Sequence, residues 1–451
     1  MGLSWWQMLP VGPTGYADSP YQSPSTFAGN PLLIELRLEP GRRAPVFPID
    51  RVDFGRVIPW RMHRLREMTT QIVTERPPEL DRFIDRHADV WLNDFALFTA
   101  IKRSENMRPW WEWDEDLKKR NRATLRRAKR SLANAVMHVI CEQFLFDRQW
   151  GELREHCADL GIGLIGDVPI FVAHDSADVW AHPDLFILDE DNEPTVIAGV
   201  PPDYFSETGQ RWGNPLYDWD RHRQTGFSWW IARMGRAFEL FDLIRVDHFR
   251  GFAASWHIPA HEETAVHGEW VEAPGQELFD RLSDIFPHLP VIAENLGIIT
   301  EDVEELRDRY QLPGMKVLQF GFGTESTHAL DQFTENVVAY TGTHDNDTTR
   351  GWFEDQDPDR EPERKAALEE LDSEGERFVW DMIQAVMESV ADTAIIPLQD
   401  VLDLGTTARM NLPGTTGGSN WCWRFRWEDL TDDIVERVRC IVERTGRSVE
   451  R

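Results

Sequence analysis

Seven short apolar runs, each with functional-looking residues toward its end, constrain the fold of this chain more than any other feature. Their apolarity is continuous and does not alternate, which is typical of strands buried on both faces, as in a parallel sheet. Stretches of helical periodicity separate most of them, for example residues 276–286 and 300–310. The runs cover residues 5–10, 161–172, 243–249, 290–297, 315–322, 337–347 and 393–402.

This alternation of strand and helix predicts an α/β fold, either a (β/α)8 barrel or a doubly wound sheet. An eight-stranded barrel is one strand short here, because the first run begins at residue 5 with no helix before it. We therefore expect the first strand and helix of such a barrel to lie upstream of Met1 or to be replaced by another element.

Two regions interrupt the rhythm of the runs. Residues 41–135 are rich in Arg, Glu, Trp and helix formers and lack a buried-strand pattern, so we expect a mainly helical insertion. Residues 173–225 form a connection rich in Gly, Pro and Asp, and long connections of this kind are usually functional. We expect about half of its aromatic side chains to be exposed in a cleft; they are Trp180, Tyr204, Phe205, Trp212, Tyr217 and Trp219.

The acidic balance of the chain restricts its partners. There are 48 basic and 78 acidic residues, and the net charge of −30 repels phosphate backbones and anionic membranes. We therefore expect neither a nucleic acid nor a membrane as a partner. Nearly all the basic residues are Arg. An acidic, lysine-poor surface is of the halophilic type, because a Debye length of about 3 Å at 1 M salt screens its self-repulsion.

The cysteines and the N-terminal residues indicate a cytoplasmic protein. Cys141, Cys157, Cys422 and Cys440 show no C-x-x-C spacing, so we expect small buried side chains and no disulfide framework. Residues 1–10 do not resemble a secretory leader, and no stretch approaches the ~18 apolar residues of a spanning helix. No pattern in the sequence selects between a monomer and a homodimer.

Three acidic residues stand where barrel enzymes carry their chemistry, at the carboxyl ends of buried runs: Asp247, Glu294 and Asp345. One carboxylate beside a glycosidic bond can attack the anomeric carbon while a second protonates the leaving oxygen. A third can stabilise the positive charge that develops on the sugar. Arg245 shares a strand face with Asp247 and should keep it ionised, while apolar surroundings should raise the pKa of Glu294.

A magnesium-dependent barrel enzyme is the competing interpretation, with the same three acids as metal ligands. Arg245 beside Asp247 argues against it, because a fixed cation competes with a metal ion. The aromatic residues of the 173–225 connection favour a sugar, since flat rings pack against the apolar C–H faces of sugars.

Three motifs resemble the catalytic motifs of the α-amylase superfamily: RVDHFRG (245–251), AENLG (293–297) and GTHDND (342–347). Longer segments are similar to the 4-α-glucanotransferases of glycoside hydrolase family 77, the amylomaltases and disproportionating enzymes. These segments cover residues 12–31, 108–117, 166–186, 198–219 and 408–415, and the resemblance extends from residue 5 to the C-terminus.

The resemblance implies a (β/α)8 TIM barrel with helical and loop insertions. Residues 1–40 would start the barrel with its second strand and a glucan-binding loop, 41–135 would form the helical insertion, and 136–451 the remaining barrel with the active-site loop 173–225. Asp247 matches the nucleophile, Glu294 the acid/base and Asp345 the stabiliser. The residues expected to bind the glucan are Ser19, Tyr21, Gln210, Trp212, Arg245, His344 and Asn411, together with His248 beside Asp247.

The implied reaction is the retaining transfer of α-1,4-glucan segments from a donor maltooligosaccharide to the 4-hydroxyl of an acceptor, through a covalent glucosyl-Asp intermediate. It requires no metal and no organic cofactor. The implied partners are maltooligosaccharides and fragments of starch or glycogen. An α-glucan hydrolase is the alternative activity.

The resemblance departs from the family at the N-terminus. Family members usually carry a strand and a helix before the segment that here begins MGLSWWQMLP, with a motif of the type His-Pro-Thr-Ser-Leu-Pro. We expect the true start to lie further upstream. The alternative is a truncated chain with an open seam between the second and eighth strands, which would threaten folding and leave an inactive glucan-binding protein.

Overall fold

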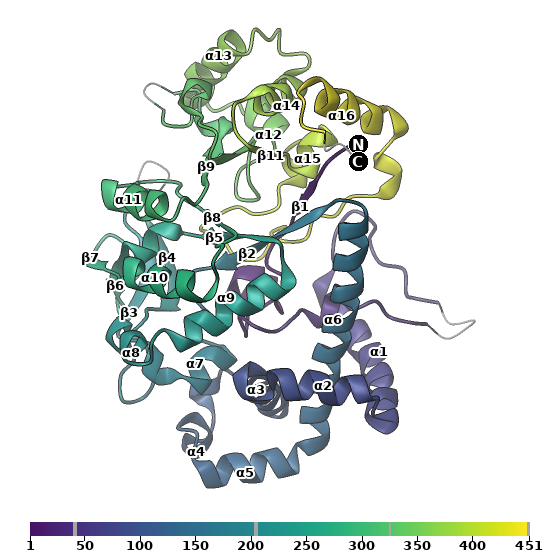
Figure 1. Cartoon of the computed structure of the whole chain (residues 1–451), viewed down its shortest axis with the longest axis vertical. Coiled ribbons are helices and arrows are strands. Elements are labelled where there is room, and N and C mark those ends of the chain that lie inside the picture. The colour runs from purple at the N-terminus through teal and green to yellow at the C-terminus, as the bar shows by residue number, and fades with distance from the viewer. Residues whose placement is uncertain (39–42, 203–205, 324–325, 449–451) are drawn as a thin grey trace.

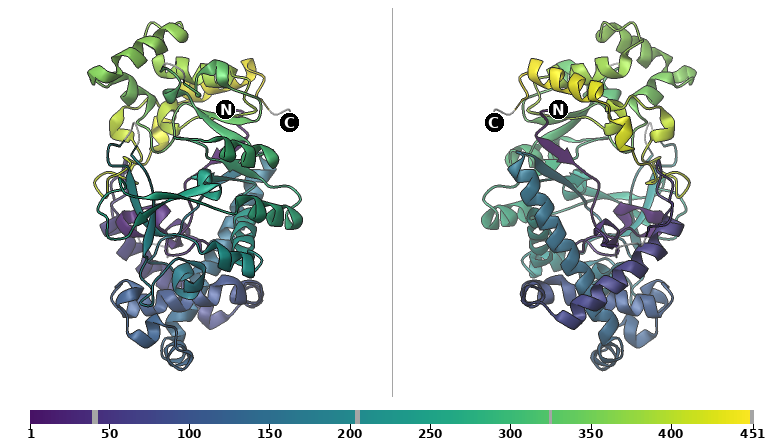
Figure 2. Two further views of the ribbon diagram at one scale, coloured as in Figure 1. Left: turned by 90° about the vertical axis from the view of Figure 1, so that its left-hand side faces the viewer. Right: turned by 90° about the vertical axis from the view of Figure 1, so that its right-hand side faces the viewer.

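The structure, a computed structural model, describes residues 1–38, 43–202, 206–323 and 326–448. Parallel strands at its centre are surrounded by helices, with α1–α5 on one side and α12–α16 on the opposite side (Figure 1). Two further views show the same division (Figure 2). The strands are β1 (Trp5–Gln7), β2 (Gly163–Pro169), β3 (Val196–Val200), β4 (Gln210–Pro215), β5 (Leu243–Asp247), β6 (Ala254–Pro259), β7 (Glu269–Glu272), β8 (Val291–Ala293), β9 (Gly314–Val317), β10 (Val337–Tyr340) and β11 (Thr393–Ile395).

Seven parallel strands form the wall of a TIM-barrel type of fold. One sheet has the order β1-β2-β5-β8 and a second has the order β11-β10-β9, and β8 lies against β9. These are the seven strands that the apolar runs predict, each found at its predicted place to within a residue or two at its start. In the part of the chain that the structure describes, no strand pairs with the outer edge of β1 or of β11.

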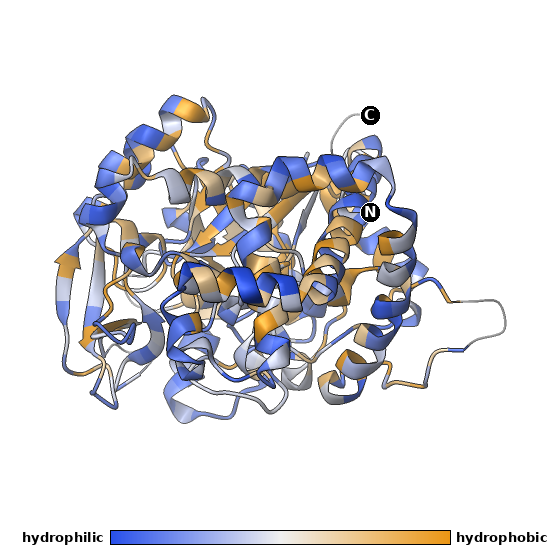
Figure 3. Cartoon of the chain, turned by 90° about the horizontal axis from the view of Figure 1, so that it is seen from below, coloured by the Kyte–Doolittle hydropathy of each residue, from blue (hydrophilic) through white to orange (hydrophobic). Residues whose placement is uncertain are grey.

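The inside of the barrel is filled by side chains from several strands. Ile165, Ile292, Val317 and Val338 are almost completely buried and form one cluster with Tyr340. Seen from below, apolar residues gather on the central strands, while the outward faces of the helices are hydrophilic (Figure 3). The continuous apolarity of the runs has this cause: one side of each strand faces the barrel interior and the other faces the helices.

Helices connect most successive strands of the wall and cover its outside. The α-helices are α1 (Phe54–Glu75), α2 (Pro78–His87), α3 (Asn93–Ser104), α4 (Glu115–Lys118), α5 (Arg122–Ser131), α6 (Ala133–Asp159), α7 (Ala177–Ala181), α8 (Trp219–Gln224), α9 (Ser228–Leu240), α10 (Gly275–Ile285), α11 (Glu301–Arg309), α12 (Thr349–Glu354), α13 (Glu361–Glu370), α14 (Phe378–Glu388), α15 (Leu398–Val401) and α16 (Asp432–Arg444). None of the helices in the described ranges is long and apolar enough to cross a membrane.

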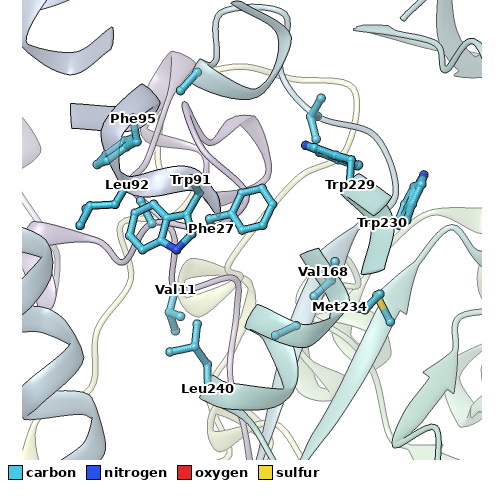
Figure 4. Close-up of a cluster of buried hydrophobic side chains, with 14 of the residues drawn as sticks. Val11, Phe27, Trp91, Leu92, Phe95, Val168, Trp229, Trp230, Met234 and Leu240 are labelled. Atoms are coloured by element: carbon cyan, nitrogen blue, oxygen red, sulfur yellow. The ribbon is translucent and has the colours of Figure 1, made fainter. Parts of the chain in front are cut away.

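An aromatic cluster joins the helical region α1–α5 to the barrel. Phe27, from the N-terminal loop, stacks on Trp91 with 6.4 Å between ring centroids and meets Trp229 of α9 edge-on at 6.2 Å. Phe95 of α3 and Trp230 of α9 extend this cluster (Figure 4). Three segments that are distant in the sequence therefore share one core, and this core holds the helical region against the barrel.

The connection 173–225 is more regular than its composition suggests. It contains α7, β3, β4 and α8, and β3 and β4 belong to an antiparallel sheet of order β4-β3-β6-β7. Trp180 and Tyr217 are buried in the core, while Trp212 and Trp219 are partly exposed, so the expectation that about half of the aromatic residues face a cleft stays a prediction. Tyr204 and Phe205 lie outside the described residues.

The prediction of buried cysteines holds for only two of the four. Cys141 and Cys157 are buried, whereas Cys422 is partly exposed and Cys440 is exposed on α16. All four are free thiols. Cys440 follows Arg439 on the polar side of an amphipathic helix, so its exposure is set by helical periodicity and not by residue type.

Candidate active site

A cleft of about 2480 Å³ opens beside the carboxyl ends of the barrel strands. The eleven side chains singled out from the sequence come from separate parts of the chain, and the structure brings all of them to this one cleft. They are Ser19, Tyr21, Gln210, Trp212, Arg245, Asp247, His248, Glu294, His344, Asp345 and Asn411.

The register of β2, β5 and β8 places the charged residues next to one another. Asp167 is paired with Arg245, and Val246 with Ala293. Asp247 follows Val246, and Glu294 follows Ala293. The two acidic residues therefore occupy neighbouring positions at the ends of parallel strands. Such positions lie about 4.8 Å apart and direct their side chains to the same side of the sheet. The two carboxyl groups therefore leave the backbone side by side.

Arg245 links two carboxylates across this sheet. Its Nη1 atom donates to both oxygens of Asp167 at 2.9 Å, and its Nη2 atom donates to Asp247 Oδ1 at 2.9 Å. Burial opposes the charge of Arg245, but Asp167 and Asp247 outweigh burial and hold its pKa above the ordinary value. A permanent cation therefore lies against Asp247.

Glu294 stands in a different environment from Asp247. Its Oε2 atom accepts a hydrogen bond from the His248 amide at 2.5 Å, and its Oε1 atom accepts one from the Leu296 amide at 2.9 Å. Burial, with a contribution from nearby Asp247, raises the pKa of Glu294 to about 7, although Arg245 acts in the opposite direction. Glu294 is thus suited to carry a proton near neutral pH, beside a carboxylate that is ion-paired with Arg245.

His248 has a strained backbone that serves this arrangement. Its φ angle of 54° lies in the left-handed region, which directs its amide toward Glu294. The imidazole meets the Trp212 ring edge-on at 4.8 Å, and burial lowers its pKa to about 4, so the ring is neutral at pH 7. Its buried Nε2 atom has no hydrogen-bond partner among the described residues.

A loop from the C-terminal part of the chain holds Asp345. Asn411 Nδ2 donates to Asp345 Oδ1 at 2.7 Å, and Arg409 Nη2 donates to the Asp345 carbonyl at 2.6 Å. The Asn411 amide donates to the His344 carbonyl at 3.1 Å. These bonds join the loop at residues 409–411 to the segment that follows β10, and Asp345 remains partly exposed in the cleft.

Tyr21 connects β2 with the segment after β10. Its hydroxyl donates to Asp167 Oδ2 at 2.7 Å and lies 2.8 Å from His344 Nε2. Ser19 supports this position because its Oγ atom accepts a hydrogen bond from the Tyr21 amide at 3.2 Å. The N-terminal loop therefore contributes an aromatic ring and a hydroxyl to the floor of the cleft.

Gln210 and Trp212 lie on β4, two positions apart and therefore on the same face of the strand. The Trp212 indole Nε1 atom donates to Gln210 Oε1 at 3.1 Å. Trp212 is partly exposed, lines the cleft and covers the His248 ring. A flat ring beside an amide is a surface that suits a sugar.

Two contributing residues were missed in the sequence. Asp167 lies inside the apolar run 161–172, where an acidic residue is unusual. This position could have indicated a functional residue. Arg409 lies in the segment 408–415, which carries a charge next to Asn411, but no spacing connects it with Asp345. In the described ranges, no group of three or more His, Cys, Asp or Glu side chains is arranged to hold a metal ion.

Comparisons with known proteins identify the family of the chain. The profile of the 4-alpha-glucanotransferase family matches residues 1–431. The chain belongs to this family.

Relatives and solved structures match nearly the whole chain. The 4-alpha-glucanotransferase of Thermus thermophilus is 49% identical over 99% of this chain and 92% of its own length. The chloroplastic/amyloplastic 4-alpha-glucanotransferase of Solanum tuberosum is 40% identical over 99% of this chain and 80% of its own. The amylomaltase of Streptococcus agalactiae, solved in complex with acarbose, superposes with a TM-score of 0.92 at 36% identity and covers 99% of this chain and 92% of its own.

Proposed function

We propose that this member of the family transfers α-1,4-glucan segments between maltooligosaccharides with retention of configuration. The observation that carries the proposal is the contrast between neighbouring carboxyl groups. Asp247 is ion-paired with Arg245, whereas Glu294 is buried with a raised pKa. Carboxyl groups about 5–5.5 Å apart are the mark of retaining glycosidases, and neighbouring positions on β5 and β8 support such a separation.

In the first step, an Asp247 oxygen attacks the anomeric carbon of the donor. The bond from this carbon to the leaving 4-oxygen breaks, and Glu294 gives its proton to that oxygen. The products are a glucosyl-Asp247 ester and a shortened glucan with a free 4-hydroxyl. Asp345 stabilises the positive charge that develops on the sugar ring. Asn411 and Arg409 hold Asp345 in position.

In the second step, the ionised Glu294 removes the proton from the 4-hydroxyl of an acceptor glucan or glucose. The acceptor oxygen attacks the anomeric carbon, and the ester bond to Asp247 breaks. Two inversions give net retention. Arg245 and His344 hold the sugar beside the scissile bond, and Ser19, Tyr21, Gln210, Trp212, His248 and Asn411 line the remaining glucan path.

The proposed partners are maltooligosaccharides and fragments of starch or glycogen, and the proposed location is the cytoplasm. An acceptor sugar competes with water only where its rings are bound, and Trp212 and Tyr21 offer aromatic surfaces for this in the cleft.

The proposal is tested by incubating the protein with maltotriose and separating the products. Transfer predicts glucose together with a ladder of longer maltooligosaccharides. Glucose and maltose without a ladder would change the assignment to an α-glucan hydrolase. Binding without turnover would indicate a glucan-binding protein, and loss of activity on adding EDTA would favour the metal-dependent alternative.

A further inference from the structure

One wall of the cleft is built by the helical region and not by strand ends. Lys102 and Arg103 of α3 and Trp111 of the short helix η5 (Trp110–Glu112) line it, next to His174 and Asp175 of the segment that follows β2. None of these three side chains takes part in the chemistry proposed above. Their position in the same cleft raises the question of what they bind.

Trp111 and His174 form a flat double layer on this wall. Their ring centroids are 4.3 Å apart and their planes are inclined by only 6°. Trp111 is half-buried and lines the cleft, so one of its faces is covered by the imidazole while part of the ring remains accessible. A ring that is backed in this way presents a rigid apolar surface at little entropic cost.

Two polar contacts hold His174 in place in this pair of rings. Trp110 is completely buried, and its indole Nε1 atom donates to the His174 carbonyl at 2.7 Å. His174 Nε2 lies 3.0 Å from the Asn192 carbonyl, and burial lowers the His174 pKa to about 4, so its ring is neutral at pH 7. The orientation of the platform is therefore set before any ligand arrives.

Polar groups surround the platform within the cleft. Lys102 Nζ donates to Asp175 Oδ2 at 2.5 Å and to the Arg108 carbonyl at 3.2 Å. Glu193 also lines the cleft, on a turn whose Asn192 carbonyl meets His174. An apolar ring in a cleft that is also lined by carboxylate and ammonium groups matches a glucose unit, which has apolar C–H faces and a rim of hydroxyl groups.

We propose that Trp111 and His174 form a glucan subsite remote from the scissile bond, at which a glucose unit of a long donor or acceptor stacks on Trp111. This inference rests on the proposed glucan transfer. His174 lies five residues beyond the end of β2 at Pro169, and an extended chain spans at most about 17 Å over that length. A donor of several glucose units bound at Asp247 is long enough to reach the platform, and we expect maltotriose, the shorter donor, to bind beside the scissile bond alone.

Kinetics with two donors test the subsite. Trp111→Ala should raise the KM for maltoheptaose about five- to tenfold, which corresponds to the loss of one aromatic contact. Its kcat, and both constants for maltotriose, should stay unchanged. Trp111→Phe keeps a flat ring and should restore most of the affinity. Trp427→Ala, at an exposed Trp outside the cleft, is the matched control. Equal effects on both donors, or no effect on maltoheptaose, would overturn the inference.

A binding measurement separates failure of the subsite from failure of the proposed function. Maltoheptaose is titrated calorimetrically into Asp247→Asn and into the double variant Asp247→Asn/Trp111→Ala. Weaker binding by the double variant supports the subsite even if the unmodified protein gives no ladder from maltotriose. Equal binding contradicts the subsite even if the ladder forms.

Discussion

The two sides of the barrel wall are held in different ways. Between β2, β5 and β8, backbone pairing places Arg245 within hydrogen-bond distance of both Asp167 and Asp247. On the other side, no described strand lies between β1 and β11, and a hydrogen bond from the Tyr340 hydroxyl to Gln7 Oε1, 2.9 Å long, joins β10 to β1. The chemistry is thus concentrated where the backbone fixes positions.

Packing of side chains supplements this second side. Met1 lies against a cluster formed by α14, α15 and α16, which includes Trp380 and Val442. The two tryptophans of β1 remain 37% and 48% exposed, so the edge of the wall is covered only in part. We therefore expect changes between β2, β5 and β8 to alter the reaction, whereas changes to the contact between β10 and β1 should alter stability.

The largest effect is expected at Asp247. Asp247→Asn keeps the shape of the side chain but removes the attacking oxygen anion, so the transfer rate should fall at least about 10³-fold. The measurement is the initial rate of glucose release from maltotriose. Asp433→Asn, on the exposed surface of α16, is the control and should leave the rate unchanged. A loss below tenfold would show that Asp247 is not the nucleophile.

Arg245→Lys should lower kcat/KM about 10²-fold. A guanidinium reaches Asp167 and Asp247 at the same time, while an ammonium group cannot reproduce both contacts. Arg426→Lys changes an exposed Arg that is paired with Asp429 and should have no effect. Equal activity of Arg245→Lys and the unmodified protein would break the link between strand register and chemistry.

The pH dependence of kcat/KM should follow Glu294. The buried carboxyl group, with a pKa raised from 4.5 to about 7, carries its proton below pH 7 and loses it above. The rate of the first step should therefore fall about tenfold per pH unit on the alkaline side. Glu294→Gln should be slow and should lack this alkaline limb. Persistence of the limb in Glu294→Gln would assign it to another group.

The smallest effect is expected on the second side of the wall. Tyr340→Phe removes the hydroxyl bonded to Gln7 and should lower the free energy of unfolding by about 1 kcal/mol in urea titrations. The transfer rate should remain within about twofold of the unmodified protein. Tyr310→Phe, at a more exposed tyrosine that donates to Asp280, should cost less stability. A large loss of activity in Tyr340→Phe would show that the two sides do not differ in their effect on the reaction.

The parallel strands were predictable because burial on both faces leaves a continuous apolar signal. The antiparallel sheet was not, since β3 and β7 are short and lie among Gly, Pro and charged residues. Their pairing with β4 and β6 is a tertiary effect that local periodicity does not carry.

The site was predictable to the extent that its residues lie at strand ends. Asp247, Glu294 and Asp345 each follow an apolar run, and parallel strands bring such ends together. The residues that hold the acidic side chains in place were not predictable. Arg409 reaches the Asp345 carbonyl across 64 positions of sequence, and no motif spacing indicates this contact.

The hydroxyl of Tyr21 has a single proton, and its position gives the network a direction. Because that proton is donated to Asp167 Oδ2, the Tyr21 oxygen can meet His344 Nε2 only as an acceptor. The Nε2 atom must then carry a hydrogen, which it donates to the Tyr21 oxygen. A tyrosine from the N-terminal loop thereby decides which ring nitrogen of a histidine 323 residues away carries a hydrogen.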